Sequence, residues 1–429
     1  MSERIYRDPV HNIIRLQTDT PESRLLIRLI DTAEFQRLRR IRQLGLALFT
    51  YQGAEHSRFT HSLGALHLAT RILEKFSAKY EISDFDRIAV RAAALLHDVG
   101  HGAFSHVMEN VLGFHHEDFT VQAVLNQETE IGQVLRSFSE ELPARVAAVI
   151  NGDFRPAALA QLVSSQLDVD RMDYLLRDSL MTGVKYGIYD HEWIIKALEI
   201  DRENDRIYVS AHGLFAVEDY LQARYYMFRQ VYFHRTLRSA EVVLRAILRR
   251  AFELNQNGKA IWIASGTAFE KVVRRERINL FEHLEIDDSD VLFHIKQWQR
   301  SDDQILSDLS RRFINRRLFK ALDLDMADDE RERFLEKARN IVTQNNFDPD
   351  YYFVSDRAAD LPYYALYSAL GETNPKNLIY VEDGFSRPQI REISEVSGAV
   401  RGLQQGFEIL RACFPPELNQ EITELYHQQ

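Results

Sequence analysis

An apolar helix that ends in metal-capable side chains constrains this chain more than any other segment. Residues 84–99 carry apolar side chains at helical spacing, so one face of the predicted helix packs on a core. Gly100 follows the apolar stripe, and glycine is the residue that most often ends a helix. We therefore expect His97 and Asp98 at a helix end, beside a loop that delivers further histidines.

Two further residues extend this pair to the pattern H…HD…D. His61 precedes the pair by one helix-loop-helix unit, and Asp170 follows it by one unit or more. Two imidazoles and two carboxylates form a mixed nitrogen and oxygen set that suits a divalent cation, and in an octahedral shell they leave two positions for water and substrate. The set fits Mn, Fe, Mg, Ni and Zn alike. A structural zinc site is usually closed and rich in cysteine, whereas this chain has one cysteine, Cys413.

Six short motifs surround these residues. They are Asp8-Pro-Val-His11, Asp31-Thr-Ala-Glu-Phe-Gln36-Arg37-Leu-Arg39, Gln43-Leu-Gly45, Arg58-Phe-Thr-His61-Ser-Leu-Gly64, His97-Asp-Val-Gly-His-Gly-Ala-Phe-Ser-His106 and Asp168-Val-Asp-Arg-Met-Asp-Tyr174. In that order they resemble the HD-domain metal phosphohydrolases, and among them the deoxynucleoside triphosphate triphosphohydrolases typified by the mammalian SAM-and-HD-domain protein and its bacterial relatives. The resemblance covers roughly residues 1–325 and implies one divalent ion, bound by His61, His97, Asp98 and Asp170.

The resemblance also implies catalytic and substrate-binding residues. His106 is expected to be the general acid, His116 to enter the pocket beside a neighbouring carboxylate, and Arg171 to stand where better-known relatives have lysine. Surface charge on an amphipathic helix is a sufficient interpretation of Asp168 and Arg177. The catalytic set is His101, His106, His116 and Glu117, and the substrate-binding set is Gln43, Leu44, Arg58, Arg171, Tyr174, Asp178, Arg224 and Tyr232.

A third set matches the positions at which regulated relatives bind a guanine nucleotide or deoxynucleotide effector between subunits. It consists of Asp31, Gln36, Arg39, Arg316 and Lys320, and the resemblance places His234 and Arg235 near phosphate or an effector. Arg4 and Trp193 do not match that effector site cleanly. Because the matched residues come from both ends of the similar region, we expect a homo-oligomer, a dimer or a tetramer.

The elements expected along the chain give a mainly α fold in two parts. Residues 1–345 are predicted to form an HD-type helical catalytic domain with an N-terminal β arm, a short hairpin strand at 206–210 and a long helix at 217–250. Residues 278–322 are expected to be helical. Residues 346–429 are expected to form a small α+β lobe, with strands at 351–354, 377–381, 393–396 and 407–414 and a helix at 415–426.

Composition narrows the class of protein. A net charge of −11 argues against a protein that coats nucleic acid, since phosphate contacts need a basic surface. No apolar run approaches the ~20 residues of a membrane span, and residues 1–4 show no signal-peptide core. With a single cysteine no intrachain disulfide can form, so we expect a cytoplasmic protein.

The predicted activity is metal-dependent hydrolysis of a deoxynucleoside triphosphate to deoxynucleoside and inorganic triphosphate, with possible activation by a nucleotide. Two alternatives stay open. One is an HD phosphohydrolase or phosphodiesterase for another nucleotide, although residues 119–124 lack the Gly-Tyr-Pro signature of the cyclic-dinucleotide branch. The other is a noncatalytic nucleotide sensor, which would ordinarily have lost a metal ligand.

Overall fold

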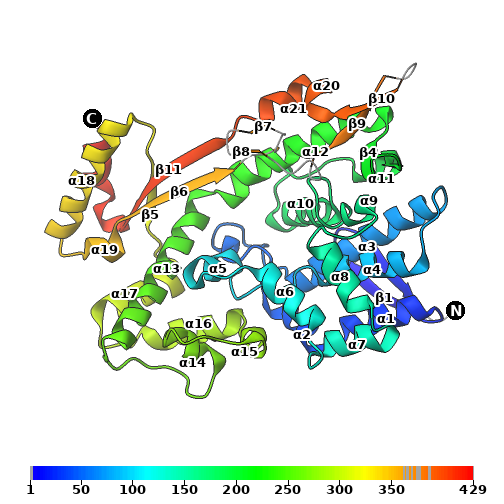
Figure 1. Ribbon diagram of the computed structural model, residues 1–429. Coiled ribbons are helices and arrows are strands. Elements are labelled where there is room, and N and C mark those ends of the chain that lie inside the picture. Colours follow the sequence, from blue (N-terminus) through cyan, green and yellow to red (C-terminus); the bar gives the residue numbers. More distant parts are fainter. Residues whose placement is uncertain are drawn as a thin grey trace.

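The structure is a computed structural model that describes residues 3–360, 363, 367–368, 371–372, 378–384 and 388–428 (Figure 1). Within these ranges, the side chains of residues 106, 360, 367–368 and 371–372 lie outside the described part. The fold is mainly helical with a few small sheets, which confirms the predicted class. None of the described helices is long and apolar enough to cross a membrane.

The helical body is built on α3 (Arg58–Ser77), which packs between α4 (Asp84–Leu96) and α10 (Val169–Thr182). Side-chain caps fix the starts of the two flanking helices. The Ser83 side chain accepts a hydrogen bond from the backbone amide of Asp86, and the Asp168 side chain accepts one from the backbone amide of Arg171. Around these three helices lie α1 (Pro21–Ile30), α2 (Ala33–Arg37), α5 (His106–Leu112), α6 (His116–Leu125), α7 (Glu130–Phe138), α8 (Leu142–Ile150), α9 (Ala157–Ala160), α11 (His191–Ala197) and α12 (Leu214–Met227).

The predicted N-terminal arm is an antiparallel hairpin of β1 (Glu3–Asp8) and β2 (Asn12–Gln17). One carboxylate oxygen of Asp8 accepts the amides of Val10 and His11, which closes the turn between the strands. Strand β2 packs on α1 and α3, so the hairpin lies against the centre of the helical body.

A second apolar core lies mainly in the second half of the chain, where it includes Trp298, Phe313 and Phe334. It also takes in buried residues between 46 and 108 from the first half. A three-stranded antiparallel sheet, in the order β5-β11-β6, covers one side of this half. Its elements are α13 (Arg235–Gln256), α14 (Ala268–Val273), α15 (Leu280–Glu285), α16 (Asp288–Trp298), α17 (Gln304–Ile314), β5 (Lys320–Asp323), α18 (Asp328–Gln344), α19 (Pro349–Tyr352), β6 (Val354–Asp360), β11 (Phe407–Phe414) and α22 (Asn419–His427).

Another sheet, in the order β10-β9-β4-β3, joins the C-terminal residues to the helical body. Its β9 lies parallel to β4, so segments from both sides of residue 345 share this sheet as well as the three-stranded one. The division at residue 345 stays a prediction. The elements of this region are β3 (Leu198–Asp201), β4 (Arg206–Val209), β7 (Tyr367–Ser368), β8 (Gly371–Glu372), β9 (Tyr380–Asp383), β10 (Gln389–Glu392), α20 (Ile393–Val396) and α21 (Gly398–Leu403).

Four predicted elements differ from the structure. The helix expected at 217–250 is two helices, because a π-helical turn at Phe228–Tyr232 ends α12 before His234 caps α13. The helical run expected at 278–322 ends in a strand, β5, which pairs with β11. Residues 351–352 close the short helix α19, and 393–396 form α20, because local caps at Asp348 and Glu392 favour a helical turn over a strand.

Candidate active site

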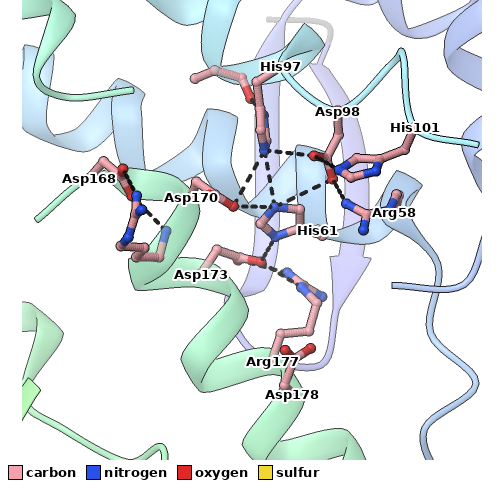
Figure 2. A network of polar contacts seen from close by, with 12 residues as sticks. Arg58, His61, His97, Asp98, His101, Asp168, Asp170, Asp173, Arg177 and Asp178 are labelled. Carbon is pink, nitrogen blue, oxygen red and sulfur yellow. Dashed lines mark hydrogen bonds and ion pairs between the residues drawn. The ribbon is translucent and has the colours of Figure 1, made fainter. Parts of the chain in front are cut away.

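Four side chains from three helices meet at one point (Figure 2). His61 lies in the first turn of α3, His97 and Asp98 follow the last residue of α4, and Asp170 lies in the first turn of α10. His61 Nε2 is 3.3 Å from His97 Nε2 and 3.0 Å from Asp170 Oδ1, and His97 Nε2 is 3.4 Å from Asp98 Oδ1. Adjacent octahedral ligands bonded at about 2.1 Å lie about 3 Å apart, so this donor set fits one divalent ion.

Hydrogen bonds fix both imidazoles with the Nε2 lone pair toward this point. His61 donates its Nδ1–H to Asp173 Oδ2 over 2.8 Å, and His97 donates its Nδ1–H to the Ala94 carbonyl over 3.0 Å. Such partners set the tautomer and orientation of metal-binding histidines. The two Nε2 atoms face each other, an arrangement that a cation between them stabilises.

The carboxylates around this point favour positive charge. Burial lowers the pKa of the His61 imidazole, but Asp170 and Asp173 raise it to about 10. Burial would raise the pKa of Asp98, yet Arg58 and His97 hold it well below its usual range, and His61 and His97 lower that of Asp170. The site therefore holds ionised carboxylates that attract a proton or a metal ion.

A second group of side chains extends the site beyond Asp98. The ligand atoms of Asp98, His101 and His116 lie within 4.8 Å of one another, and the two imidazole rings stack with centroids 3.5 Å apart. Burial and the nearby Arg58 lower the pKa of His101 well below its usual value. His101 is therefore neutral near pH 7, and the group adds a neutral imidazole beside the predicted ligands.

The predicted catalytic residues have different surroundings. The carboxylate that bonds His116 is Glu109, whose Oε1 accepts both the ring Nδ1–H and the backbone amide. Glu117 lines the same cavity but is exposed. The side chain of His106 lies outside the described residues, and its backbone begins α5.

A cavity of about 510 Å³ opens above these residues. It is lined by most residues of the predicted substrate-binding set, which come from distant parts of the chain. From that set its lining contains Gln43, Leu44, Arg58, Arg171, Tyr174, Asp178 and Tyr232. Arg224 is absent from the lining, although its buried guanidinium lies 5.5 Å from the centroid of Phe228, a lining residue.

The three predicted phosphate-binding arginines are paired to different extents. Arg58 Nη1 donates to Asp98 Oδ2 over 2.6 Å, and Arg171 donates to Asp168 and to the Ser165 carbonyl. Within the described part of the chain, the buried Nε and Nη1 of Arg224 have no hydrogen-bond partner, nor has the buried Nε of Arg171. Buried guanidinium donors without partners are costly, so these atoms favour an anionic ligand.

One end of the cavity is suited to a sugar. Asp178 Oδ2 accepts the Tyr232 hydroxyl over 2.9 Å, while Asp178 Oδ1 accepts the His56 Nε2–H over 2.8 Å. The rings of Tyr174 and Tyr232 lie edge to face, 6.2 Å apart. A carboxylate between aromatic walls can accept a hydroxyl group while the rings pack on the sugar.

Two residues interpreted as surface charges are buried. Asp168 caps α10 and binds Arg171, and Arg177 pairs with Asp173 and Asp8 without solvent exposure. Helical periodicity placed them on a polar face but could not show what covers that face. Sequence reasoning also omitted His11, His56, Glu109 and Asp173 from the site. The available signals were the Asp8-Pro-Val-His11 motif and the spacing of Asp170, Asp173 and Asp178.

The predicted effector residues are in separate places within one chain. Arg235, Arg316 and Lys320 line a second, basic cavity of about 760 Å³, and His234 caps the helix beside it. Asp31 pairs with Arg4, and Gln36 accepts from Arg39. Among the described residues, no hydrogen bond or ion pair joins the two groups.

Comparisons with known proteins agree with the residue pattern. The family described as HD domain matches residues 58–178, and the one described as HD associated region matches residues 189–265. The chain is 40% identical over 402 residues to the uncharacterized protein YwfO of Bacillus subtilis. The aligned region covers 94% of this chain and 89% of YwfO.

Two further similarities concern named hydrolases. The chain is 30% identical to the deoxynucleoside triphosphate triphosphohydrolase SAMHD1 homolog of Dictyostelium discoideum, over 57% of this chain and 48% of that protein. The match therefore spans about half of that relative. A crystal structure of a phosphohydrolase from Bacteroides thetaiotaomicron has a TM-score of 0.82 and 29% identity, covering 96% of this chain and 100% of that one.

Proposed function

Because this chain belongs to the HD-domain phosphohydrolase family, with YwfO and SAMHD1 proteins among its relatives, we propose that it is a metal-dependent deoxynucleoside triphosphate triphosphohydrolase. The observation that carries the proposal is one cavity whose lining contains three candidate ligands, Arg171 and the Asp178–Tyr232 pair. The three ligands are His97, Asp98 and Asp170, and the fourth, His61, is buried with its Nε2 3.0 Å from Asp170 Oδ1. Among the described residues, the buried Nε of Arg171 has no hydrogen-bond partner. The candidate ligands are suited to a metal ion, the arginine donors to a polyphosphate, and the Asp178–Tyr232 pair to a sugar.

Hydrolysis would begin with attack of water on the α-phosphorus. The bond between that phosphorus and the 5′-oxygen breaks, and the 5′-oxygen takes a proton, which gives deoxynucleoside and triphosphate. A divalent ion held by His61, His97, Asp98 and Asp170 would supply charge neutralisation and orient the reacting groups.

Side chains in the cavity lining and next to it would divide the remaining work. Arg171 and Arg224 bind phosphate oxygens, and Arg58 does so while it holds Asp98 in place. We assign the proton transfer to His106. His101, which is neutral, and His116, which Glu109 orients, contact phosphate or polarise water, and Glu117 stands at the exposed edge of the cavity.

The same cavity would discriminate between sugars. Asp178 accepts the 3′-hydroxyl, Tyr174 packs on the nucleoside, and Tyr232 lies where it can exclude a 2′-hydroxyl by contact with C2′. Gln43 and Leu44, which also line the cavity, contact base and sugar, and the buried Oε1 of Gln43 has no partner in the described part of the chain.

The second cavity supports regulation by an anionic effector. Arg235, Arg316 and Lys320 place positive charge at the cavity without any ion pair among the described residues. A guanine nucleotide or deoxynucleotide there would recruit Asp31, Gln36 and Arg39 from a second chain. A homo-oligomer, a dimer or a tetramer, would then bind the effector better than a single chain does.

A nucleotide panel tests the proposed activity. Protein loaded with Mn²⁺, Mg²⁺, Fe²⁺, Ni²⁺ or Zn²⁺ is incubated with each deoxynucleoside triphosphate, each ribonucleoside triphosphate and a cyclic dinucleotide. The assay is repeated with added guanosine triphosphate, and Asp170→Ala serves as the blank. Triphosphate release from deoxynucleotides alone supports the proposal, and turnover only of another nucleotide supports the alternative HD phosphohydrolase.

A further inference from the structure

The turn of the N-terminal hairpin reaches the partner of a candidate metal ligand. His11, in that turn, donates its Nε2–H to Asp173 Oδ1 over 2.7 Å, and Asp173 accepts the Nδ1–H of His61 on its other oxygen over 2.8 Å. The side chain of His11 is 2% exposed, and those of Asp173 and His61 are fully buried. A buried chain of contacts therefore runs from residue 11 to residue 61.

Asp173 has no freedom to change partners. Arg177 donates to both of its oxygens, over 2.7 and 2.9 Å, so two histidines and one arginine supply four contacts in all. A carboxylate has about four lone-pair positions, and these contacts use all of them. Asp8, the residue that closes the hairpin turn, pairs with Arg177 over 2.8 Å and fixes that cation from the other side.

The packing of α3 makes room for this network. A Cβ atom at Gly64 would lie 1.8 Å from Asp173 Oδ1 and 2.5 Å from Arg177 Nη2. Gly64 is on the same helix as His61, less than one turn later. The glycine of the His61-Ser-Leu-Gly64 motif thus lets the carboxylate approach the helix that carries the candidate ligand.

We propose that His11 and Asp8 are positioning residues of the metal site, which hold Asp173 and through it His61. The contacts that carry this inference come from the hairpin, about 50 residues before the first ligand in the sequence. It rests on the proposed function, because it requires that His61 binds a metal ion.

Loss of His11 would remove one of four donors from a buried carboxylate. Asp173 could then rotate away from the geometry that fixes the His61 tautomer. Changes to such outer partners typically weaken metal affinity by about 10- to 100-fold. The hairpin itself would stay paired, because its strands and the Asp8 turn do not involve the His11 side chain.

Metal affinity of the full-length protein, measured without substrate, tests the inference. Co²⁺ and Mn²⁺ are titrated against a chromophoric chelator, and the visible spectrum of the Co²⁺ protein reports ligand geometry. His11→Ala is compared with His11→Gln, whose amide can donate near the position of Nε2, and with Arg15→Ala. Arg15 is an exposed cation on β2 that contacts none of these groups.

We expect Co²⁺ affinity about 10- to 100-fold weaker in His11→Ala with an altered Co²⁺ spectrum, recovery in His11→Gln, and no change in Arg15→Ala. Unchanged affinity and spectrum in His11→Ala would overturn the inference and leave the proposed function intact. Failure of the unaltered protein to bind either ion would overturn both. If His11→Ala unfolds where Arg15→Ala is folded, His11 has a purely structural role and the inference is wrong.

Discussion

The two cavities of this chain hold their cations in different ways. In the first cavity Arg58 and Arg171 are each bonded to a carboxylate, Asp98 and Asp168. In the second cavity no ion pair among the described residues involves Arg235, Arg316 or Lys320. The cations of the first cavity are therefore held within one chain. In the described lining of the second cavity only Arg312 is ion-paired, with Asp308 and Glu417, whereas those three cations are exposed to solvent, where they can attract an anion or an acidic surface of another chain.

Removal of a candidate ligand should break the first cavity most completely. Asp170→Ala takes away a carboxylate 3.0 Å from His61 Nε2, so we expect metal retention to be lost and turnover to fall by about 10³-fold or more. Elemental analysis and initial rates measure the two effects. Binding of a labelled nucleotide at the second cavity should persist. Full metal occupancy in the variant would remove Asp170 from the ligand set.

Arg224, which is buried beside the lining residue Phe228 of the first cavity, should have the next largest effect. Arg224→Ala removes two buried donors that have no partner among the residues that the structure describes, so we expect kcat/KM to fall by about 10²-fold with the metal still bound. Arg229→Ala is the matched control, since Arg229 is an exposed cation that donates to Tyr225. Equal rates for the two variants would show that Arg224 does not contact the reacting phosphate.

The second cavity should respond only through activation. Arg316→Ala should abolish an increase in rate by guanosine triphosphate, about tenfold for a typical coupling free energy, while basal turnover and metal content stay unchanged. Arg300→Ala, an exposed cation outside the cavity, is the control. Sedimentation with and without nucleotide accompanies the kinetics. A monomer with effector-independent turnover would contradict the regulatory proposal and leave the catalytic one untouched.

The smallest expected effect is on the pH dependence of folding stability, and it comes from a buried histidine beside the first cavity. The described lining of the second cavity contains no histidine, so we expect no such effect there. Burial lowers the pKa of His283 to about 3, and its Nε2–H donates to the Gly100 carbonyl over 2.7 Å. In the unfolded chain this group titrates near 6.5, so its stabilisation is lost as the pH falls below that value. From pH 7 to pH 5 the loss is about 2 kcal/mol.

His283→Gln keeps a donor and removes the titration. Denaturant unfolding at pH 7 and pH 5 should therefore show a smaller loss of stability in this variant than in the unaltered protein. An identical pH dependence in the two proteins would mean that folding does not shift the pKa of His283.

The sequence predicted the helical class and the convergence of the H…HD…D side chains because each depends on local signals. His97 and Asp98 follow an apolar stripe that a glycine ends, and Asp170 follows the Asp168 cap. The other half of the site depends on contacts distant in sequence. Arg177 was interpreted as a surface charge because its partner Asp8 lies 169 positions earlier. Apolar spacing continues through the π-helical turn at 228–232, so the local pattern predicts one helix there.

The C-terminal strands show the same limit of local patterns. Residues 407–414 were predicted as a strand from their alternating apolar side chains, and they form β11. The strand that pairs with them on one side, β5, was placed in a helix, since its basic neighbours continue the helical spacing of α17. Whether such a segment forms a strand depends on the strand that it pairs with. A pairing strand about 90 residues away in the sequence cannot be inferred from the local pattern of side chains.

Hydrolysis in ¹⁸O-water tests the central claim most directly. One equivalent of deoxynucleoside triphosphate is turned over by the metal-loaded protein, and the products are identified by ³¹P NMR and mass spectrometry. The account predicts inorganic triphosphate that carries one ¹⁸O atom and a deoxynucleoside without label, because water attacks the α-phosphorus and the 5′-oxygen departs. Label in the deoxynucleoside, or release of pyrophosphate or phosphate in place of triphosphate, would contradict it.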